Sequence, residues 1–360
     1  MCWAAEAAEG PRGGVRDDRS ADVVGSGATA RLQIRGGGLS DNVLRRERLR
    51  APVRRSGLHR LLAARPRRSV LSVIVVCHNE KDYLERTVRS LHQGLPGLSE
   101  ILVVDDQSTD GCCDDLLRNP ASKRVRVVRS PERLGVSRAR NFGAALSRGE
   151  ILVFSDAHCE APAGWAQAVI EALGDPVVGA VSPAISVLDD SDGAQGYGMR
   201  FVSTGFDVDW LGKAGEEPYA VPLLCGCFMA LRREVFEQLG GFDSGMLLWG
   251  SEDLELSMHL WLRGFECRML PQIAVAHRFS SGFRYPVHWE PLYNRLRMGL
   301  VHLGARRCLD LMSHNQNDEQ LAAVWERLVS SDVWSRKTAI QQARVHDDDW
   351  YFGRFPISAA

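Results

Sequence analysis

Residues 70–77 read Val-Leu-Ser-Val-Ile-Val-Val-Cys, and this apolar run decides the fold class. A run without polar alternation is typical of a strand buried on both faces of a parallel sheet. Working outward, three more apolar runs follow at 101–104, 125–128 and 151–154, separated by helical patterns at 80–92, 109–118 and 136–147. The alternation predicts an α/β fold, with a mostly parallel sheet covered by helices on both faces.

The second half of the chain is less regular. Segments 177–188 and 223–231 are predicted to join or extend the sheet, and 266–270 to form a short strand. Helices are expected at 251–263, 292–303, 319–329 and 335–343. We therefore expect a domain over 69–282, with halves 69–160 and 161–282, and a helical extension over 283–360. Residues 1–68 are rich in Gly and Arg with little periodicity, which predicts a disordered leader.

Composition excludes several classes of protein. The 360 residues carry a formal net charge of −1, which argues against a nucleic-acid binder. No apolar stretch is long enough to cross a bilayer, and no secretory signal is visible. The nine cysteines lack a C-x-x-C pair, which favours reduced thiols in a cytoplasmic protein over a zinc site or disulfides. The alternative is a protein that docks onto nucleic acid or a membrane surface through the basic stretch 45–68.

Polar residues follow three of the predicted strands. They are His78-Asn79-Glu80, Asp105-Asp106 and Asp156-Ala157-His158. In open parallel sheets, ligands bind beyond the C-terminal strand ends, so these clusters are expected at one edge. A carboxylate and an imidazole two residues apart can hold an ion such as Mn²⁺, with positions left for phosphate oxygens. Such an ion neutralises a leaving diphosphate.

Four segments carry a resemblance to a known family. They are SVIVVCHNE at 72–80, EILVVDDQS at 100–108, GVSRARNFGAALSRGEILVFSDAHCE at 135–160 and GGFDSGMLLWGSEDLELSMHLWLR at 240–263. Over about 70–282 the chain resembles glycosyltransferases of the GT-A fold, in family 2 and the polypeptide N-acetylgalactosaminyltransferases. A nucleotidyltransferase is disfavoured, because no Gly-rich basic loop follows the first strand.

The resemblance implies a Rossmann-like GT-A fold and an enzyme that transfers a hexosyl or N-acetylhexosaminyl unit. The donor would be a nucleoside diphosphate-sugar, UDP-linked, and the acceptor an unidentified hydroxyl. Residues implied on the donor side are Val76, His78, Glu80, Asp105, Asp106, Arg138, Arg140, Asp156, Gly226 and Trp249. Among them, Asp106 is expected to bind the uracil edge and an arginine, Arg140 rather than Arg138, to reach the diphosphate. An Asx turn at Asp106 and simple packing at Gly226 are the alternatives.

The resemblance also implies the metal ligands. His277 would complete, from the far side of the cleft, a site for Mn²⁺ or Mg²⁺ begun by Asp156 and His158. A histidine after a strand is otherwise usually structural.

Residues 249–253, Trp-Gly-Ser-Glu-Asp, are the last candidate. Glycines at 240, 241, 245 and 250 predict a mobile loop that brings Trp249 over the sugar. Glu252 and Asp253 are the expected catalytic residues. An Asp at 253 resembles the base of inverting enzymes, whereas the polypeptide transferases have Asn there and retain configuration. We expect inversion with Asp253 as base, and retention is the alternative. The helix near 289–307 is expected to present a solvated basic face.

Overall fold

The computed structural model describes residues 71–96, 99–118, 123–190, 193–279 and 287–357, all of which belong to one compact unit. The expected leader over 1–68 lies outside these residues, and the expected domain boundaries stay predictions. Among the described helices, none combines the length and apolar character that crossing a membrane requires.

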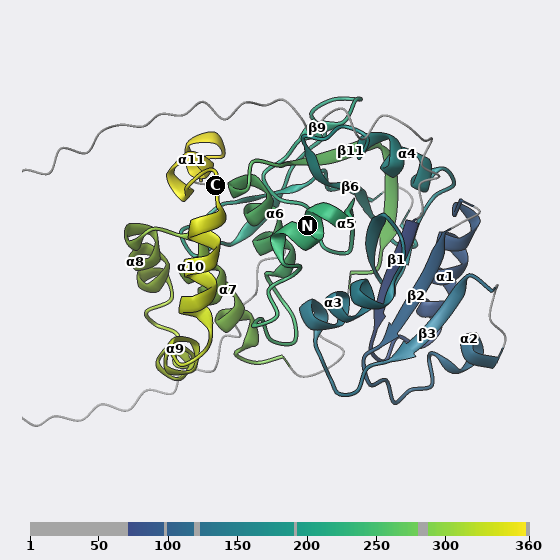
Figure 1. Ribbon diagram of the computed structural model, residues 1–360, viewed down its shortest axis with the longest axis horizontal. Coiled ribbons are helices and arrows are strands. Elements are labelled where there is room, and N and C mark those ends of the chain that lie inside the picture. Colours follow the sequence, from purple (N-terminus) through teal and green to yellow (C-terminus); the bar gives the residue numbers. More distant parts are fainter. Residues whose placement is uncertain (1–70, 97–98, 119–122, 191–192, 280–286, 358–360) are drawn as a thin grey trace, which may run out of the picture. The chain divides into compact units, whose positions relative to one another are not determined.

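A mixed sheet forms the centre of the molecule (Figure 1). Its strands lie in the order β3-β2-β1-β4-β10-β6-β11-β5, and β9 pairs with β11. Their bounds are β1 Leu71–Cys77, β2 Glu100–Asp105, β3 Val125–Arg129, β4 Ile151–Asp156, β5 Cys159–Glu160, β6 Val178–Val187, β9 Tyr219–Ala220, β10 Phe228–Arg232 and β11 Glu266–His277. The first four strands are parallel to one another, and β10 runs antiparallel between β4 and β6. A separate pair consists of β7 (Met199–Phe201) and β8 (Val208–Trp210).

The first strand explains why the sheet forms. Leu71, Val73, Ile74 and Val75 have no exposed surface, because β1 lies between β2 and β4 and is covered on both faces. Burial of such side chains stabilises each by about 1.5–3 kcal/mol. The parallel register brings the C-terminal ends of β1, β2 and β4 to one edge, as the strand pattern predicted.

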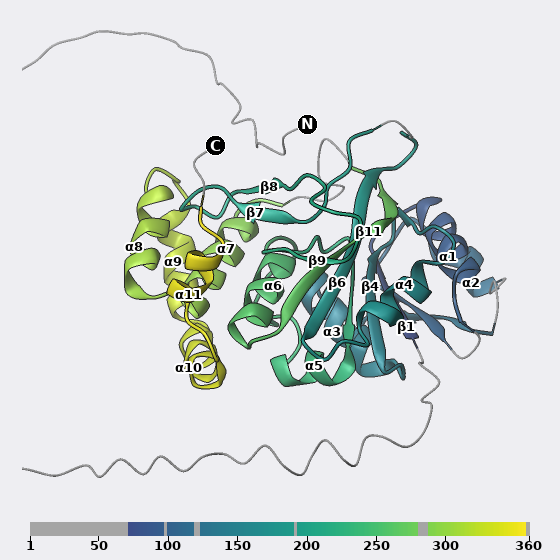
Figure 2. The same ribbon diagram turned by 90° about the horizontal axis from the view of Figure 1, so that it is seen from above.

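Helices cover both faces of the sheet (Figure 2). On one face lie α1 (Tyr83–Gln93), α2 (Asp114–Arg118) and α4 (Trp165–Ala172). The other face carries α3 (Val136–Leu146), α5 (Arg233–Leu239) and α6 (Glu252–Leu262). Helix α3 packs so closely that a Cβ at Gly143 would lie 2.5 Å from Ile74, so glycine is required there. This layered α/β architecture confirms the predicted fold class.

Five further helices lie on the side of the sheet away from β3 (Figure 1). They are α7 (Glu290–His302), α8 (Ala305–His314), α9 (Leu321–Val329), α10 (Val333–Ala343) and α11 (Asp348–Arg354). Helix α7 contacts α6, α8, α9 and α10, and α11 also contacts α6. The predicted solvated face of this helix is wrong: Asn294, Arg297 and His302 are buried, because their polar atoms pair with groups of the packed core.

Several elements escaped the sequence patterns. Strands β5, β7, β8 and β9 have two or three residues each, too few for any periodicity. Helices α4, α5, α8 and α11 were also missed. Strand β11 has 12 residues rather than five, because an irregularity between Leu270 and Ala274 interrupts its pairing with β6 and its apolar pattern.

Candidate active and metal site

Asp156, His158 and His277 converge at the edge of the sheet. Asp156 ends β4, and the antiparallel pairing of β5 with β11 sets His277 opposite Cys159. The rings of His158 and His277 are 4.8 Å apart between centroids. One potential ligand atom from each of the three residues lies within 4.8 Å of the other two. The structure thus brings together residues separated by more than a hundred positions, and their role as ligands stays a prediction.

The chemistry of this group fits a divalent ion. The His277 side chain is buried, and neither ring nitrogen has a hydrogen-bond partner among the described residues. Its Nε2 lies 3.5 Å from Asp156 Oδ2, which is an ion-pair distance without hydrogen-bond geometry. Burial lowers the pKa of His277. Burial opposes ionisation of Asp156, but its contacts with His277 and Arg140 prevail and lower its pKa. A neutral imidazole beside an ionised carboxylate is the form that binds metal.

Glu80 contacts one of the candidate metal ligands, His158. Its Oε2 lies 3.1 Å from His158 Nδ1, and the carboxylate is buried. A carboxylate on one ring nitrogen fixes the imidazole so that the other nitrogen can face a metal. Glu80 was expected on the donor side, whereas its carboxylate contacts His158. No local pattern announces this contact, which joins residues 78 positions apart.

Arg140 lies beneath the site and not in it, which corrects the expectation that it reaches the diphosphate. It is 2% exposed, and its Nη2 donates to Asp156 Oδ1 at 3.0 Å and to the Gly226 carbonyl at 2.7 Å. Its Nη1 lies 3.3 Å from Glu252 Oε1. The guanidinium therefore neutralises two carboxylates in a desolvated position and has no exposed face for a phosphate.

Glu252 and Asp253 begin α6, as expected. Asp253 is half-buried, and its carboxylate accepts hydrogen bonds from the amides of Gly226 at 2.8 Å and Leu254 at 2.9 Å. Burial raises the pKa of Asp253. Burial, together with the charge of Asp253, raises the pKa of Glu252 to about 7. Asp253 is thus a fixed carboxylate with increased proton affinity, as a general base requires.

Gly226 serves packing against Asp253. A Cβ there would lie 2.8 Å from the Cβ of Asp253, and the backbone of Gly226 bonds both Asp253 and Arg140. The glycine therefore connects the two candidate centres, Asp156 through Arg140 and Asp253 directly. Its expected approach to a sugar stays a prediction.

The carboxylates that end β2 are occupied by the protein. Asp106 has no exposed surface and accepts hydrogen bonds from the amides of Leu134 and Gly135, from Ser130 and from Arg133. This corrects the expected contact of its carboxylate with uracil, because no oxygen is left accessible. Asp105 likewise accepts from the Ser108 amide and from Arg129. Asp105 thus shapes the turn after β2, whereas Asp106 bonds to the remote segment 130–135 and does not form the Asx turn that was its alternative.

The remaining candidates lie around this edge. Val76 is half-buried and pairs in register with Asp156, and His78 Nδ1 lies 2.8 Å from the Asp106 carbonyl oxygen. Arg138 is 42% exposed and forms an ion pair with Glu132, so it is the outward arginine of the two. Trp249 is half-buried in the loop before α6. Their expected contacts with a donor stay predictions.

Asn294 of α7 is a residue that sequence reasoning missed. Its side-chain amide donates to the carbonyls of Leu247, Trp249 and Gly250, and its oxygen accepts from the Leu247 amide. The loop that carries Trp249 is therefore held by the helical extension in this conformation. A buried asparagine in a helix was the available signal, but burial of that face was not predicted.

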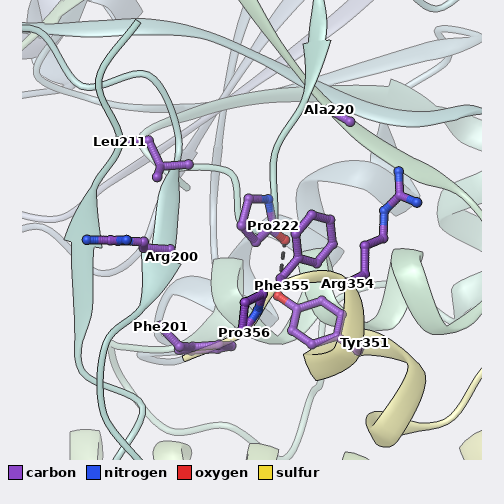
Figure 3. A pocket seen from close by; sticks show the side chains of 9 residues that line it. All are labelled: Arg200, Phe201, Leu211, Ala220, Pro222, Tyr351, Arg354, Phe355 and Pro356. Atoms are coloured by element: carbon purple, nitrogen blue, oxygen red, sulfur yellow. Dashed lines mark hydrogen bonds between the residues drawn. The ribbon is translucent and has the colours of Figure 1, made fainter. Parts of the chain in front are cut away.

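A cavity of about 310 Å³ lies elsewhere, between β7, β9 and α11 (Figure 3). Tyr351 donates a hydrogen bond to the Pro222 carbonyl across it. The cavity is lined by Arg200, Phe201, Leu211, Ala220, Pro222, Tyr351, Arg354, Phe355 and Pro356. It shares no residue with the candidate site, so it is not the site that the sequence predicted.

Comparison with known proteins gives matches along most of the described unit. A family model described as glycosyl transferase family 2 matches residues 72–240, and one described as N-terminal domain of galactosyltransferase matches 213–281. Polypeptide N-acetylgalactosaminyltransferase 5 of Caenorhabditis elegans is 30% identical over 253 residues, which are 64% of this chain and 40% of that protein. The human polypeptide N-acetylgalactosaminyltransferase 13 is 32% identical over 315 residues, 78% of this chain and 53% of that protein.

The fold matches as well. The crystal structure of GalNAc-T7 with UDP, GalNAc and Mn²⁺ superposes with a TM-score of 0.65 at 23% identity, covering 80% of this chain and 57% of that one. The chain spans only about half the length of the curated relatives that it matches. Residues 72–240 thus match the glycosyl transferase family 2 model, the fold is the GT-A fold seen in GalNAc-T7, and the sequence is similar to the polypeptide N-acetylgalactosaminyltransferases.

Proposed function

We propose that this protein is a metal-dependent glycosyltransferase that moves a sugar from a UDP-linked donor to an acceptor hydroxyl. The observation that carries the proposal is the convergence of Asp156, His158 and His277 at the C-terminal edge of the sheet, where neither ring nitrogen of His277 has a hydrogen-bond partner among the described residues. Ligands of open α/β sheets bind at this edge, which suits the diphosphate of a donor.

Similarity supports the choice of donor and metal. The relatives are named for N-acetylgalactosaminyl transfer, and GalNAc-T7 was crystallised with UDP, GalNAc and Mn²⁺. One carboxylate and two imidazoles suit Mn²⁺ and leave positions for diphosphate oxygens. When bound, the ion would supply charge neutralisation for the leaving diphosphate.

The residues of the chain have separate tasks in this proposal. Arg140 and Glu80 orient Asp156 and His158 from the buried side. Asp253 takes the proton of the attacking hydroxyl, held in place by two backbone amides and favoured by its raised pKa. A base on the acceptor side leads to single displacement, so the anomeric configuration is inverted.

The second candidate is a retaining transferase. It is favoured by the similarity to the polypeptide N-acetylgalactosaminyltransferases. The resemblance to that family implies retention of configuration. Retention needs no base on the acceptor side, so in that case Asp253 would only anchor Gly226 through the bond to its amide.

Three measurements test the proposal. A thermal-shift screen of UDP-sugars with Mn²⁺ or with EDTA is expected to give a shift for a donor only in the presence of the ion. With that donor and an accepted hydroxyl, nuclear magnetic resonance of the product assigns the anomer. Asp253→Asn is expected to lower the transfer rate by about 10²–10⁴-fold.

The exposed Asp310→Asn is the matched control and is expected to keep the wild-type rate. Wild-type transfer by Asp253→Asn would exclude that residue as the base. A UDP-sugar that gives the same thermal shift with EDTA as with Mn²⁺ would refute the metal-dependent mechanism as a whole.

We also propose a reducing compartment, the cytoplasm, for this protein. All cysteines among the described residues are free thiols, although several lie within 4 Å of one another. Subcellular fractionation tests this proposal, and recovery in an oxidising compartment would contradict it. Peripheral contact with a membrane through the stretch 45–68 remains the expectation from sequence, and deleting 1–65 tests it.

A further inference from the structure

Three thiols meet at a place that the proposed reaction does not use. Cys77 ends β1, and Cys112 and Cys113 lie just before α2. The sulfur of Cys113 lies 3.5 Å from that of Cys77 and 3.9 Å from that of Cys112. All three sulfurs are within 4.8 Å of one another. Spacing along the sequence gave no hint of this, because 34 residues separate Cys77 from the adjacent pair.

Sulfur separations of 3.5 and 3.9 Å are compatible with ligands around one metal ion. Tetrahedral thiolate sites have metal–sulfur bonds of about 2.3 Å, which separates neighbouring sulfurs by about 3.8 Å. A disulfide requires about 2.0 Å, and all three thiols are free. We propose that Cys77, Cys112 and Cys113 bind a single thiophilic cation of the Zn²⁺ class.

Access and selectivity agree with this assignment. Cys77 and Cys113 are buried, whereas Cys112 is half-buried, which leaves a side from which an ion enters and water completes the coordination. Three soft thiolates select a different metal from the carboxylate and imidazoles of the candidate active site, which suit Mn²⁺. The site therefore stands apart from the proposed function and does not depend on it. A second thiol pair, Cys159 and Cys227, is not separate, because it shares His277 with the candidate active site.

The position of the ion gives it a structural task. The segment after Cys77 is already tied to the segment before Cys112: the Lys81 amide donates to Asp110 at 2.9 Å, and the Thr109 amide donates to Asn79 at 2.8 Å. An ion bound to the three thiolates would link the same two segments through its coordination bonds. Both segments follow strands that end at the candidate donor edge, so metal binding is expected to stiffen that edge.

The test uses the full-length, reduced, metal-free protein titrated with Cd²⁺. A thiolate-to-Cd²⁺ charge-transfer absorption that saturates at one equivalent is expected, and Zn²⁺ is expected to compete for the site. Cys112→Ser and Cys113→Ser should each weaken or abolish the absorption. Cys308→Ser, which changes a half-buried thiol remote from the cluster, should keep it.

A second measurement separates this site from the other one. In a His158→Ala, His277→Ala background, Zn²⁺ is expected to raise the melting temperature by several degrees, and adding Cys112→Ser should remove the rise. Cys112 is the safest variant for folding because its side chain is half-buried, and circular dichroism checks the fold. The proposal is overturned by the absence of any thiolate absorption with Cd²⁺, by its persistence in both Cys112→Ser and Cys113→Ser, or by its loss only in Cys227→Ser.

Discussion

Two clusters in this molecule contain the same set of four side chains: one carboxylate, two imidazoles and one guanidinium. The edge cluster lies at the C-terminal edge of the sheet and consists of Asp156, His158, His277 and Arg140. The helix cluster lies between α6, α7 and α10 and consists of Glu255, His259, His302 and Arg336. In each, the arginine lies 3.0 Å from the carboxylate.

The difference between them is access. Glu255 has no exposed surface, and its Oε1 lies 2.8 Å from His302 Nε2, so an imidazole already occupies the carboxylate. Asp156 keeps 30% of its side chain exposed, and His277 stands 3.5 Å away without a hydrogen bond. We therefore expect the same side chains to be structural where they are sealed from solvent, and suited to a ligand where one of them is open to it. Residue type alone does not distinguish the two.

The largest effect is expected when one imidazole is removed from each cluster and the metal responses of the two variants are compared. His277→Gln is expected to lower metal-dependent transfer by about 10³-fold, because several kcal/mol of charge stabilisation depend on the ion and about 1.4 kcal/mol corresponds to a factor of ten. Initial rates at saturating donor over a Mn²⁺ titration measure the effect.

His302→Gln is the matched control. It is expected to leave the Mn²⁺ affinity unchanged and to lower the stability of the fold, since His302 belongs to the sealed cluster. Equal losses of metal response in both variants would show that access does not separate the clusters.

The second prediction concerns the sealed carboxylate. Glu255→Gln is expected to lower the free energy of unfolding by about 3 kcal/mol, because it removes one of the two buried carboxylates that pair with Arg336 and leaves only Asp243. Urea unfolding followed by circular dichroism measures the change. Unaltered stability would mean that Glu255 does not stabilise the fold. A weakened Mn²⁺ response would mean that the helix cluster affects metal binding as the edge cluster does.

The sequence predicted the edge cluster and missed the helix cluster for a physical reason. The edge cluster follows strands whose apolar runs are visible locally, and parallel register then carries their ends to one edge. Family resemblance added His277, which local pattern alone would have left as a structural histidine. The helix cluster depends on how α7 and α10 pack. Burial of polar residues by such tertiary packing produces no periodic pattern in the sequence.

The same limit explains the errors at the edge itself. Sequence correctly placed Asp106 after the second strand and Arg140 on the helix before the fourth, but could not tell which atoms stay accessible. Arg133 and the amides after it occupy Asp106, and Glu252 with Asp156 occupies Arg140. The position of a side chain was therefore predictable from the order of strands and helices. Its hydrogen-bond and ion-pair partners were not.

A smaller effect is expected from the support of the edge cluster. Glu80→Gln is expected to weaken Mn²⁺ binding by about 10–100-fold, because a carboxylate on His158 orients the ring and increases its basicity. Isothermal titration with Mn²⁺ measures the affinity. Glu85→Gln, on the exposed face of α1, is the control and should bind as the wild type does. Equal affinities in the two variants would show that the contact at His158 is incidental.

The smallest effect is a pH dependence of the helix cluster. Burial lowers the pKa of His259 to about 3, and Glu255 only partly opposes this. The unfolded chain takes up a proton on this residue near pH 6.5, whereas the native protein does so only at about pH 3. Between those values the unfolded state binds more protons, so stability falls as the pH falls, by up to about 1.4 kcal/mol per pH unit for this group.

Urea unfolding between about pH 7.5 and pH 5 measures the slope. This window lies above the range near pH 4 where protonation of Glu255, whose pKa is lowered, would add a second loss. His277, whose pKa is also lowered, contributes to the wild-type slope, so the comparison is made with His259→Gln, in which only the share of His259 is absent. The variant is expected to have the shallower slope, and the exposed His314→Gln the wild-type slope. A His259→Gln slope as steep as that of the wild type would mean that water reaches the helix cluster, and the contrast with the edge cluster would then not rest on access.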